Sequence, residues 1–159
     1  MANWEERIRA FWLEASDADA EAVLSSMRIL IAERDDNDPA ANYEWASVHD
    51  FLGREAEAIP LYRRALDLGL DPERRSQALI QLASSLRNIG ETTEAIKILE
   101  GVRPDRTIGD AGKAFLALSL FDAGRPGDAL RVALKALGKT LPRYHGVVDQ
   151  YADAITNPE

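Results

Sequence analysis

Residues 45–59 decide the fold of this chain, and they read WASVHDFLGREAEAI. The same pattern returns at 82–96 as LASSLRNIGETTEAI and at 116–130 as LALSLFDAGRPGDAL. In every copy the second and the fourteenth residues are alanine and the ninth residue is glycine. The large residues before each glycine stand three or four positions apart, which is the period of a helix with one buried face. The chain is therefore an internal repeat of a helical unit.

The glycine of each copy predicts where one helix ends and the next begins. Gly53, Gly90 and Gly124 can adopt the left-handed backbone of a helix C-terminus at little steric cost. The alanines on the two sides of each glycine allow the two helices to approach closely, since a short turn brings their surfaces into contact. Each copy therefore predicts a helix hairpin.

These residues resemble the tetratricopeptide repeat, a helix hairpin of about 34 residues with small residues at the crossing and a glycine in the turn. The resemblance covers about 39–137, and the runs 49–58 and 81–88 are also similar to small uncharacterised bacterial tetratricopeptide proteins. It implies an all-α fold, a right-handed α–α superhelix of about nine helices. We expect a single domain, 1–159, with repeats at about 39–75, 76–109 and 110–138.

Both ends of the chain are predicted to carry atypical elements, because a terminal repeat faces solvent on one side. Residues 3–38 read as a degenerate copy in which Leu13 takes a large apolar position. Ser16 or Asp17 is expected to cap the second helix of this copy in place of glycine. A capping helix at about 141–155 is expected to cover the final repeat. Its predicted apolar stripe consists of Val147, Val148, Tyr151 and Ile155.

Prolines support the predicted helix boundaries. Pro39, Pro72, Pro126 and Pro142 each stand where a new helix should begin, the position at which a missing N–H is tolerated. Pro60 instead falls inside the second helix of its hairpin. There it removes a hydrogen bond and its ring meets the preceding turn, so we expect a kink.

The composition excludes several classes of partner. The 159 residues include 27 acidic and 19 basic side chains, for a net charge of −8, which repels nucleic acid and anionic membrane surfaces. There are no cysteines, so disulfides and thiolate metal sites are excluded. No uncharged apolar stretch is long enough to span a bilayer, and the N-terminus does not read as a secretion signal. We expect a cytoplasmic protein that binds neither nucleic acid nor membrane.

The first helix of each hairpin is expected to line a concave groove. In repeats of this kind such a groove takes a peptide or a protein segment. Following the matching helix faces from copy to copy predicts a groove that is polar toward the N-terminus and apolar toward the C-terminus. The predicted groove residues are Tyr43, Glu44, Ser47, Asp50, Gln77, Gln81, Ser84, Arg87, Asn88, Phe121 and Asp122.

A polar cluster within this set has two interpretations. Gln81, Ser84, Arg87 and Asn88 share one helical face, and Asp50 is predicted to lie beside Arg87 on the neighbouring helix. A guanidinium with amide neighbours suits the carboxylate or the backbone amides of a bound peptide. The same side chains could instead form an internal network between adjacent repeats. The sequence leaves both interpretations open.

Two apolar rows are expected to belong to the core. The row Ala114, Phe115, Leu118 and Phe121 is expected to be covered by the C-terminal helix or by the curvature of the chain, as apolar stripes usually are. The N-terminal stripe is expected to be a core face as well, and it consists of Trp4, Ile8, Phe11 and Trp12.

Motifs for chemistry do not assemble in this sequence. Residues 109–114 only partly match a phosphate loop, and the acidic run that begins at Asp17 lacks the glycine and glutamate of a calcium loop. His49 is expected to fill a core position, and two histidines without cysteines are too few for a zinc site. The one conceivable catalytic set is His49, Asp50 and Arg87. We therefore predict a non-enzyme without a cofactor.

Two functions follow from these observations. The leading hypothesis is a non-enzymatic interaction module that binds a peptide or protein segment in its concave groove. The alternative is a structural protein that self-assembles into a homo-oligomer through apolar groove or terminal surfaces.

Overall fold

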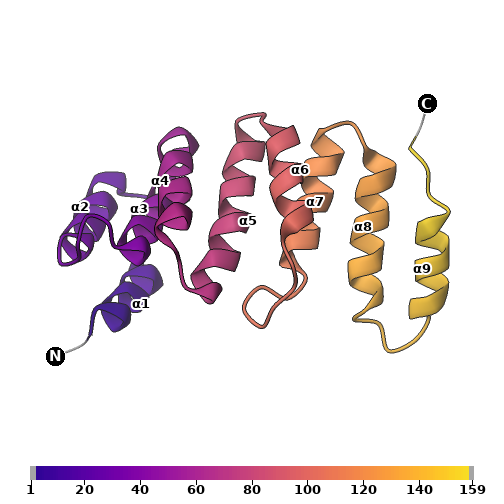
Figure 1. The fold of residues 1–159 in the computed structure, drawn as a ribbon, viewed down its shortest axis with the longest axis horizontal. Helices are drawn as coiled ribbons and strands as arrows, with labels where there is room; N and C mark the ends of the chain where they lie inside the picture. Colours follow the sequence, from indigo (N-terminus) through magenta and orange to yellow (C-terminus); the bar gives the residue numbers. More distant parts are fainter. Residues whose placement is uncertain (1–2, 158–159) are drawn as a thin grey trace.

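The computed structural model describes residues 3–157, and within them it contains nine α-helices and no β-strand. The helices are α1 (Trp4–Glu14), α2 (Ala20–Ile31), α3 (Pro39–Phe51), α4 (Glu55–Leu68), α5 (Pro72–Asn88), α6 (Thr92–Gly101), α7 (Ala111–Asp122), α8 (Pro126–Gly138) and α9 (His145–Asp153). They follow one another along an elongated slab, with the two termini at opposite ends (Figure 1). The prediction of an all-α fold is confirmed.

Small buried residues hold the helices of a hairpin together. Ala46 on α3 and Ala58 on α4 are both fully buried, and so are Ala83 and Ala95 in the next hairpin. At the turns, Gly53, Gly90 and Gly124 have φ angles of 66°, 90° and 74°. A Cβ at these glycines would meet no neighbouring atom, so the backbone conformation and not a lack of space requires glycine.

Three of the four prolines predicted to start a helix do so. Pro39, Pro72 and Pro126 lie in the first turns of α3, α5 and α8. Pro142 does not, because the chain bends after it and α9 begins only at His145. The residue before His145 is Tyr144, whose left-handed φ of 68° separates the bend from the helix.

Helix α4 continues through Pro60 from Glu55 to Leu68. A single proline within an α-helix removes one backbone hydrogen bond without ending the helix where tertiary packing holds it. Here the packing comes from Ile59, Tyr62 and Ala65, which are buried on the same helix. The kink at Pro60 remains a prediction.

The N-terminal stripe is part of a second core that joins α1 and α2 to α3. Trp4 and Ile8 are buried in it, as predicted, and the members of this cluster are Trp4, Ile8, Val23, Leu24, Met27, Ala41 and Val48. The prediction that Leu13 takes a large apolar position in the degenerate copy is wrong, since Leu13 is 87% exposed. The cap of α2 is also wrong: Asp19, not Ser16 or Asp17, accepts the Ala22 backbone N–H.

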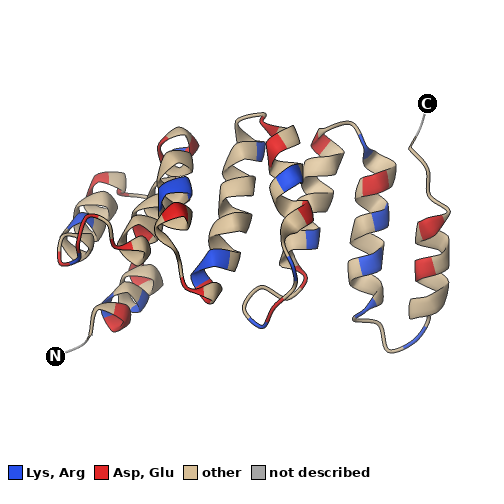
Figure 2. Cartoon of the chain, in the orientation of Figure 1, with Lys and Arg blue, Asp and Glu red and all other residues tan. Residues whose placement is uncertain are grey.

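Helix α9 packs on α8 and is shorter than predicted. Its fully buried residue is Ala152, whereas Val147 and Tyr151 of the predicted apolar stripe are exposed. Basic residues on α8 lie opposite acidic residues on α9 (Figure 2), and Lys135 pairs with Asp153 at 2.5 Å. An ion pair between α8 and α9 thus stands beside an apolar contact that is smaller than the sequence predicted.

The C-terminal tail completes the N-terminus of α8. Asn157 Oδ1 accepts the backbone N–H groups of Gly127 at 2.8 Å and Asp128 at 3.2 Å. Arg125, the residue before α8, supplies no side-chain cap of its own. A residue 30 positions away in the sequence therefore caps this helix.

Gly127→Ala is expected to destabilise the fold. A Cβ at Gly127 would lie 2.4 Å from the backbone oxygen of Thr156, so the tail must move and the Asn157 cap is weakened. We expect a loss of about 1–3 kcal/mol in the free energy of unfolding, measured by urea denaturation. Gly146→Ala is the matched control, because a Cβ there meets no atom and alanine favours a helix. Equal stability of the two variants would contradict this account.

Candidate functional site

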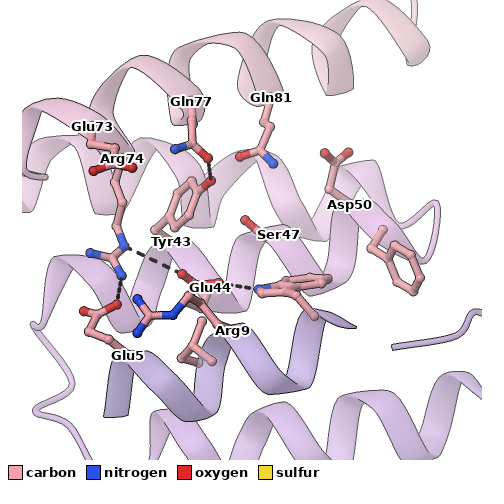
Figure 3. A pocket seen from close by; sticks show the side chains of 13 residues that line it. Glu5, Arg9, Tyr43, Glu44, Ser47, Asp50, Glu73, Arg74, Gln77 and Gln81 are labelled. Carbon is pink, nitrogen blue, oxygen red and sulfur yellow. Dashed lines mark hydrogen bonds and ion pairs between the residues drawn. The ribbon is translucent and has the colours of Figure 1, made fainter. Parts of the chain in front are cut away.

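An open hollow of about 590 Å³ lies between α1, α3 and α5. Helices α3 and α5 are the first helices of successive hairpins, and their side chains and those of α1 converge on the hollow (Figure 3). The lining residues are Glu5, Ile8, Arg9, Trp12, Tyr43, Glu44, Ser47, Asp50, Phe51, Glu73, Arg74, Gln77 and Gln81. The hollow thus combines aromatic walls with charged and amide groups.

The helical period explains why these side chains meet. On α3, Tyr43, Ser47 and Asp50 follow one another at intervals of four and three residues and so share one face. On α5, Gln77 and Gln81 share a face in the same way. The hydroxyl of Tyr43 donates to Gln77 Oε1 at 3.2 Å, which links the two walls.

One end of the hollow is closed by an ion-pair network around Arg74. Arg74 pairs with Glu5 on α1, and its Nε lies 3.6 Å from Glu44 Oε1 on α3 (Figure 3). Trp12 Nε1 donates to Glu44 Oε2 at 2.8 Å. Burial raises the pKa of Glu44, and the Trp12 hydrogen bond and the charge of Arg74 oppose that rise. The network ties α1 to both α3 and α5.

The other end of the hollow carries Asp50 without a positive partner. Asp50 accepts hydrogen bonds from Ser85 Oγ at 2.8 Å and from the Tyr62 hydroxyl at 3.3 Å. Burial raises the pKa of the Asp50 carboxyl, and the two hydrogen bonds lower it. No basic side chain within residues 3–157 forms an ion pair with this carboxylate. Close by on α5, the enclosed Oε1 of Gln81 accepts no hydrogen bond from the part of the chain that the structure describes.

A family model described as the tetratrico peptide repeat matches residues 39–155. The chain belongs to the tetratricopeptide repeat family. Proteins built from this repeat generally act as protein–protein interaction modules and are typically not enzymes. No curated protein and no solved structure matches the chain.

Six of the eleven groove residues predicted for this tetratricopeptide chain line the hollow, and they are Tyr43, Glu44, Ser47, Asp50, Gln77 and Gln81. Arg87 pairs with Asp122 through its Nε at 2.5 Å and forms no ion pair with Asp50 among the described residues. Asn88 donates to Glu55 at 3.1 Å. Arg87, Asn88 and Asp122 therefore connect adjacent helices, as the internal-network interpretation expects. Ser84 is partly buried and does not line the hollow.

The wall formed by α1 was missing from the predicted set. Its residues Glu5, Arg9 and Trp12 line the hollow. The Glu5–Arg74 ion pair and the Trp12–Glu44 hydrogen bond hold α1 against α5 and α3. The degenerate copy at 3–38 carried this signal, since the first helix of each pair faces the groove. Arg74 was missed on α5 although it stands three residues before Gln77.

The C-terminal apolar row is exposed, contrary to the expectation that it is covered. Leu118 is 47% exposed and Phe121 is 64% exposed, whereas Phe115 is partly buried against the core. The physical reason is the position of α9, which packs on α8 and leaves this face of α7 open.

The conceivable catalytic set is not assembled. His49 is buried against Trp45, with ring centroids 4.6 Å apart, while Asp50 bonds to Ser85 and Arg87 pairs with Asp122. Across residues 3–157, no group of three or more His, Asp or Glu side chains is placed to hold a metal ion. None of the helices in the same range is long and apolar enough to cross a bilayer.

Glu44→Gln tests whether burial of the charged Glu44 carboxylate lowers the free energy of unfolding. Because burial raises the folded-state pKa of Glu44 above its ordinary 4.5, the native wild type takes up a proton before the unfolded chain does as the pH falls. The stability of wild type relative to Glu44→Gln should therefore rise as the pH falls from neutrality toward 4.5. Urea unfolding at several pH values measures this difference.

Glu33→Gln is the control of opposite sign. The Arg7 hydrogen bond holds the pKa of Glu33 below 4.5, so the stability that Glu33 contributes is present above that value and is lost below it. If the difference in free energy of unfolding between wild type and Glu44→Gln stays constant from neutral pH down to pH 4.5, Glu44 is not desolvated.

Proposed function

We propose that this tetratricopeptide protein binds a segment of a partner protein in the hollow between α1, α3 and α5. The observation that carries the proposal is the convergence of three first helices on one open hollow of about 590 Å³. A volume of this size accommodates several side chains of an extended segment or one face of a helix.

The side chains of the hollow have the composition of a recognition surface. Trp12 and Phe51 form an edge-to-face pair with ring centroids 5.8 Å apart, and Phe51 is 42% exposed. Aromatic side chains that are half-buried before binding often carry much of the affinity of an interface. The amides of Gln77 and Gln81 can bond to the backbone of a bound segment.

The remaining polar groove residues support the choice of this hollow over the rest of the groove. Arg87 and Asn88 are engaged with Asp122 and Glu55, so a ligand at that position would have to displace contacts between repeats. Asp50 and Gln81 keep hydrogen-bonding capacity that the other described residues do not fill. The hollow is thus the better-prepared site.

Phe51→Ala is expected to weaken binding of a partner segment by about tenfold, since it removes an aromatic wall of the hollow. The measurement is the affinity, by calorimetry, of short peptides that the full chain selects from a random displayed library. Ile89→Ala is the matched control: Ile89 is a similarly exposed apolar residue at the end of α5 and does not line the hollow. Equal loss of affinity in both variants would count against the hollow as the site.

Self-assembly is a second candidate function, and the exposed apolar residues near the C-terminus favour it. Leu118 and Phe121 stand three residues apart on α7, and both are exposed. Contiguous apolar patches on a protein surface normally meet a partner, which can be a second copy of the same chain.

Light scattering over a wide range of protein concentrations separates the two functions. We expect the mass of a monomer at every concentration, because the hollow is formed by three helices of one chain and needs no second copy. A mass that rises with concentration and returns to that of a monomer in Phe121→Asp would favour self-assembly. The variant should fold normally, since Phe121 is exposed.

A further inference from the structure

We propose that the bound segment inserts an arginine side chain into the hollow, where the guanidinium pairs with Asp50 and lies against Trp12. This inference rests on the proposed function and adds the chemical class of the partner: a segment with an exposed arginine. It is carried by two groups that face the same hollow and that have no positive partner among residues 3–157.

The first group is the Asp50 carboxylate. The hollow is lined by four acidic residues, Glu5, Glu44, Asp50 and Glu73, and by two basic residues, Arg9 and Arg74. Arg74 is engaged with Glu5 and Glu44, and Figure 3 shows Arg9 on the same side of the hollow as Arg74. The opposite end, at Asp50 and Gln81, therefore has negative charge without compensation (Figure 3).

Desolvation makes this carboxylate a binding group for a cation. Burial raises the pKa of Asp50, and the hydrogen bonds from Ser85 and Tyr62 oppose that rise. A guanidinium at hydrogen-bonding distance would supply the missing positive charge in an environment that screens it poorly. Nearby Glu55 adds negative potential at the same end.

The second group is the indole of Trp12. The chain has three tryptophans, and two of them carry a guanidinium over the ring. Arg34 lies 4.8 Å from the Trp4 ring centroid and Arg28 lies 5.5 Å from that of Trp45. Trp12 has no such partner within residues 3–157, although its ring lines the hollow. An incoming cation would give it the same contact.

Gln81 favours arginine over lysine. Gln81 lies beside Asp50 on the α5 wall of the hollow (Figure 3), and its enclosed Oε1 accepts no hydrogen bond from residues 3–157. The planar guanidinium has several donors in a fixed fork, so it can bond to Asp50 and Gln81 while its face lies on Trp12. A lysine ammonium can make fewer of these contacts at once.

An anionic ligand fits this hollow less well. The guanidinium of Arg87, which could have held a carboxylate, pairs with Asp122. The net charge of −8 also repels an acidic segment before contact. Charge complementarity therefore points to a basic segment.

The test uses the full chain and random peptides displayed as a library, from which binders are selected and then synthesised. We expect arginine to be enriched at one position of the binders. Replacing that arginine by citrulline, a neutral residue of the same shape, should raise the Kd by about tenfold or more. Asp50→Asn should remove the difference between the two peptides. Asp67→Asn, which removes the same charge from the exposed face of α4, should leave it unchanged.

The citrulline comparison is made on the wild-type chain, so it decides the matter even if Asp50→Asn folds poorly. Binders that depend on Phe51 but show no arginine enrichment, or bind equally with citrulline, would overturn the inference and leave the proposed function standing. Binders that are all insensitive to Phe51→Ala would overturn the proposed function and the inference with it.

Discussion

The close approach of paired helices at buried alanines is the constraint on which this structure depends. Helix α3 packs on α4 and α5 packs on α6, and each of these four helices carries a fully buried alanine of the repeat pattern: Ala46, Ala58, Ala83 and Ala95. A larger side chain at any of these positions would push the two helices apart. The distance between successive hairpins would then change. The orientation of each first helix relative to the next would change with it.

This geometry creates a recognition surface without a dedicated element. Helices α1, α3 and α5 each present one face to the same hollow, so they bring together residues that are far apart in the sequence, such as Glu5 and Arg74. The hollow is therefore a product of stacking, and the ion-pair network at one end fixes the distance between its walls. The polar groups that take no part in this network, Asp50 and Gln81, lie at the other end.

The polar residues of the first helices divide into two roles. Arg87 and Asn88 connect neighbouring helices through Asp122 and Glu55. Asp50 and Gln81 retain capacity toward the hollow. Both pairs look alike in the sequence, because all four residues belong to the groove side of α3 and α5. Arg87 and Asn88 bind to neighbouring helices because a partner side chain there, Asp122 or Glu55, lies within hydrogen-bonding distance.

The sequence by itself determined the helix hairpins, their turns and the starts of α3, α5 and α8, since these depend on local rules for alanine, glycine and proline. It also determined six residues of the hollow through the helical period. The tertiary structure alone decided the partners of Arg87 and Asp50, the wall formed by α1, and the capping of α8 by Asn157. The reason is physical: the helical period fixes which face a side chain is on, whereas its partner is set by the distance between helices, which no local pattern encodes.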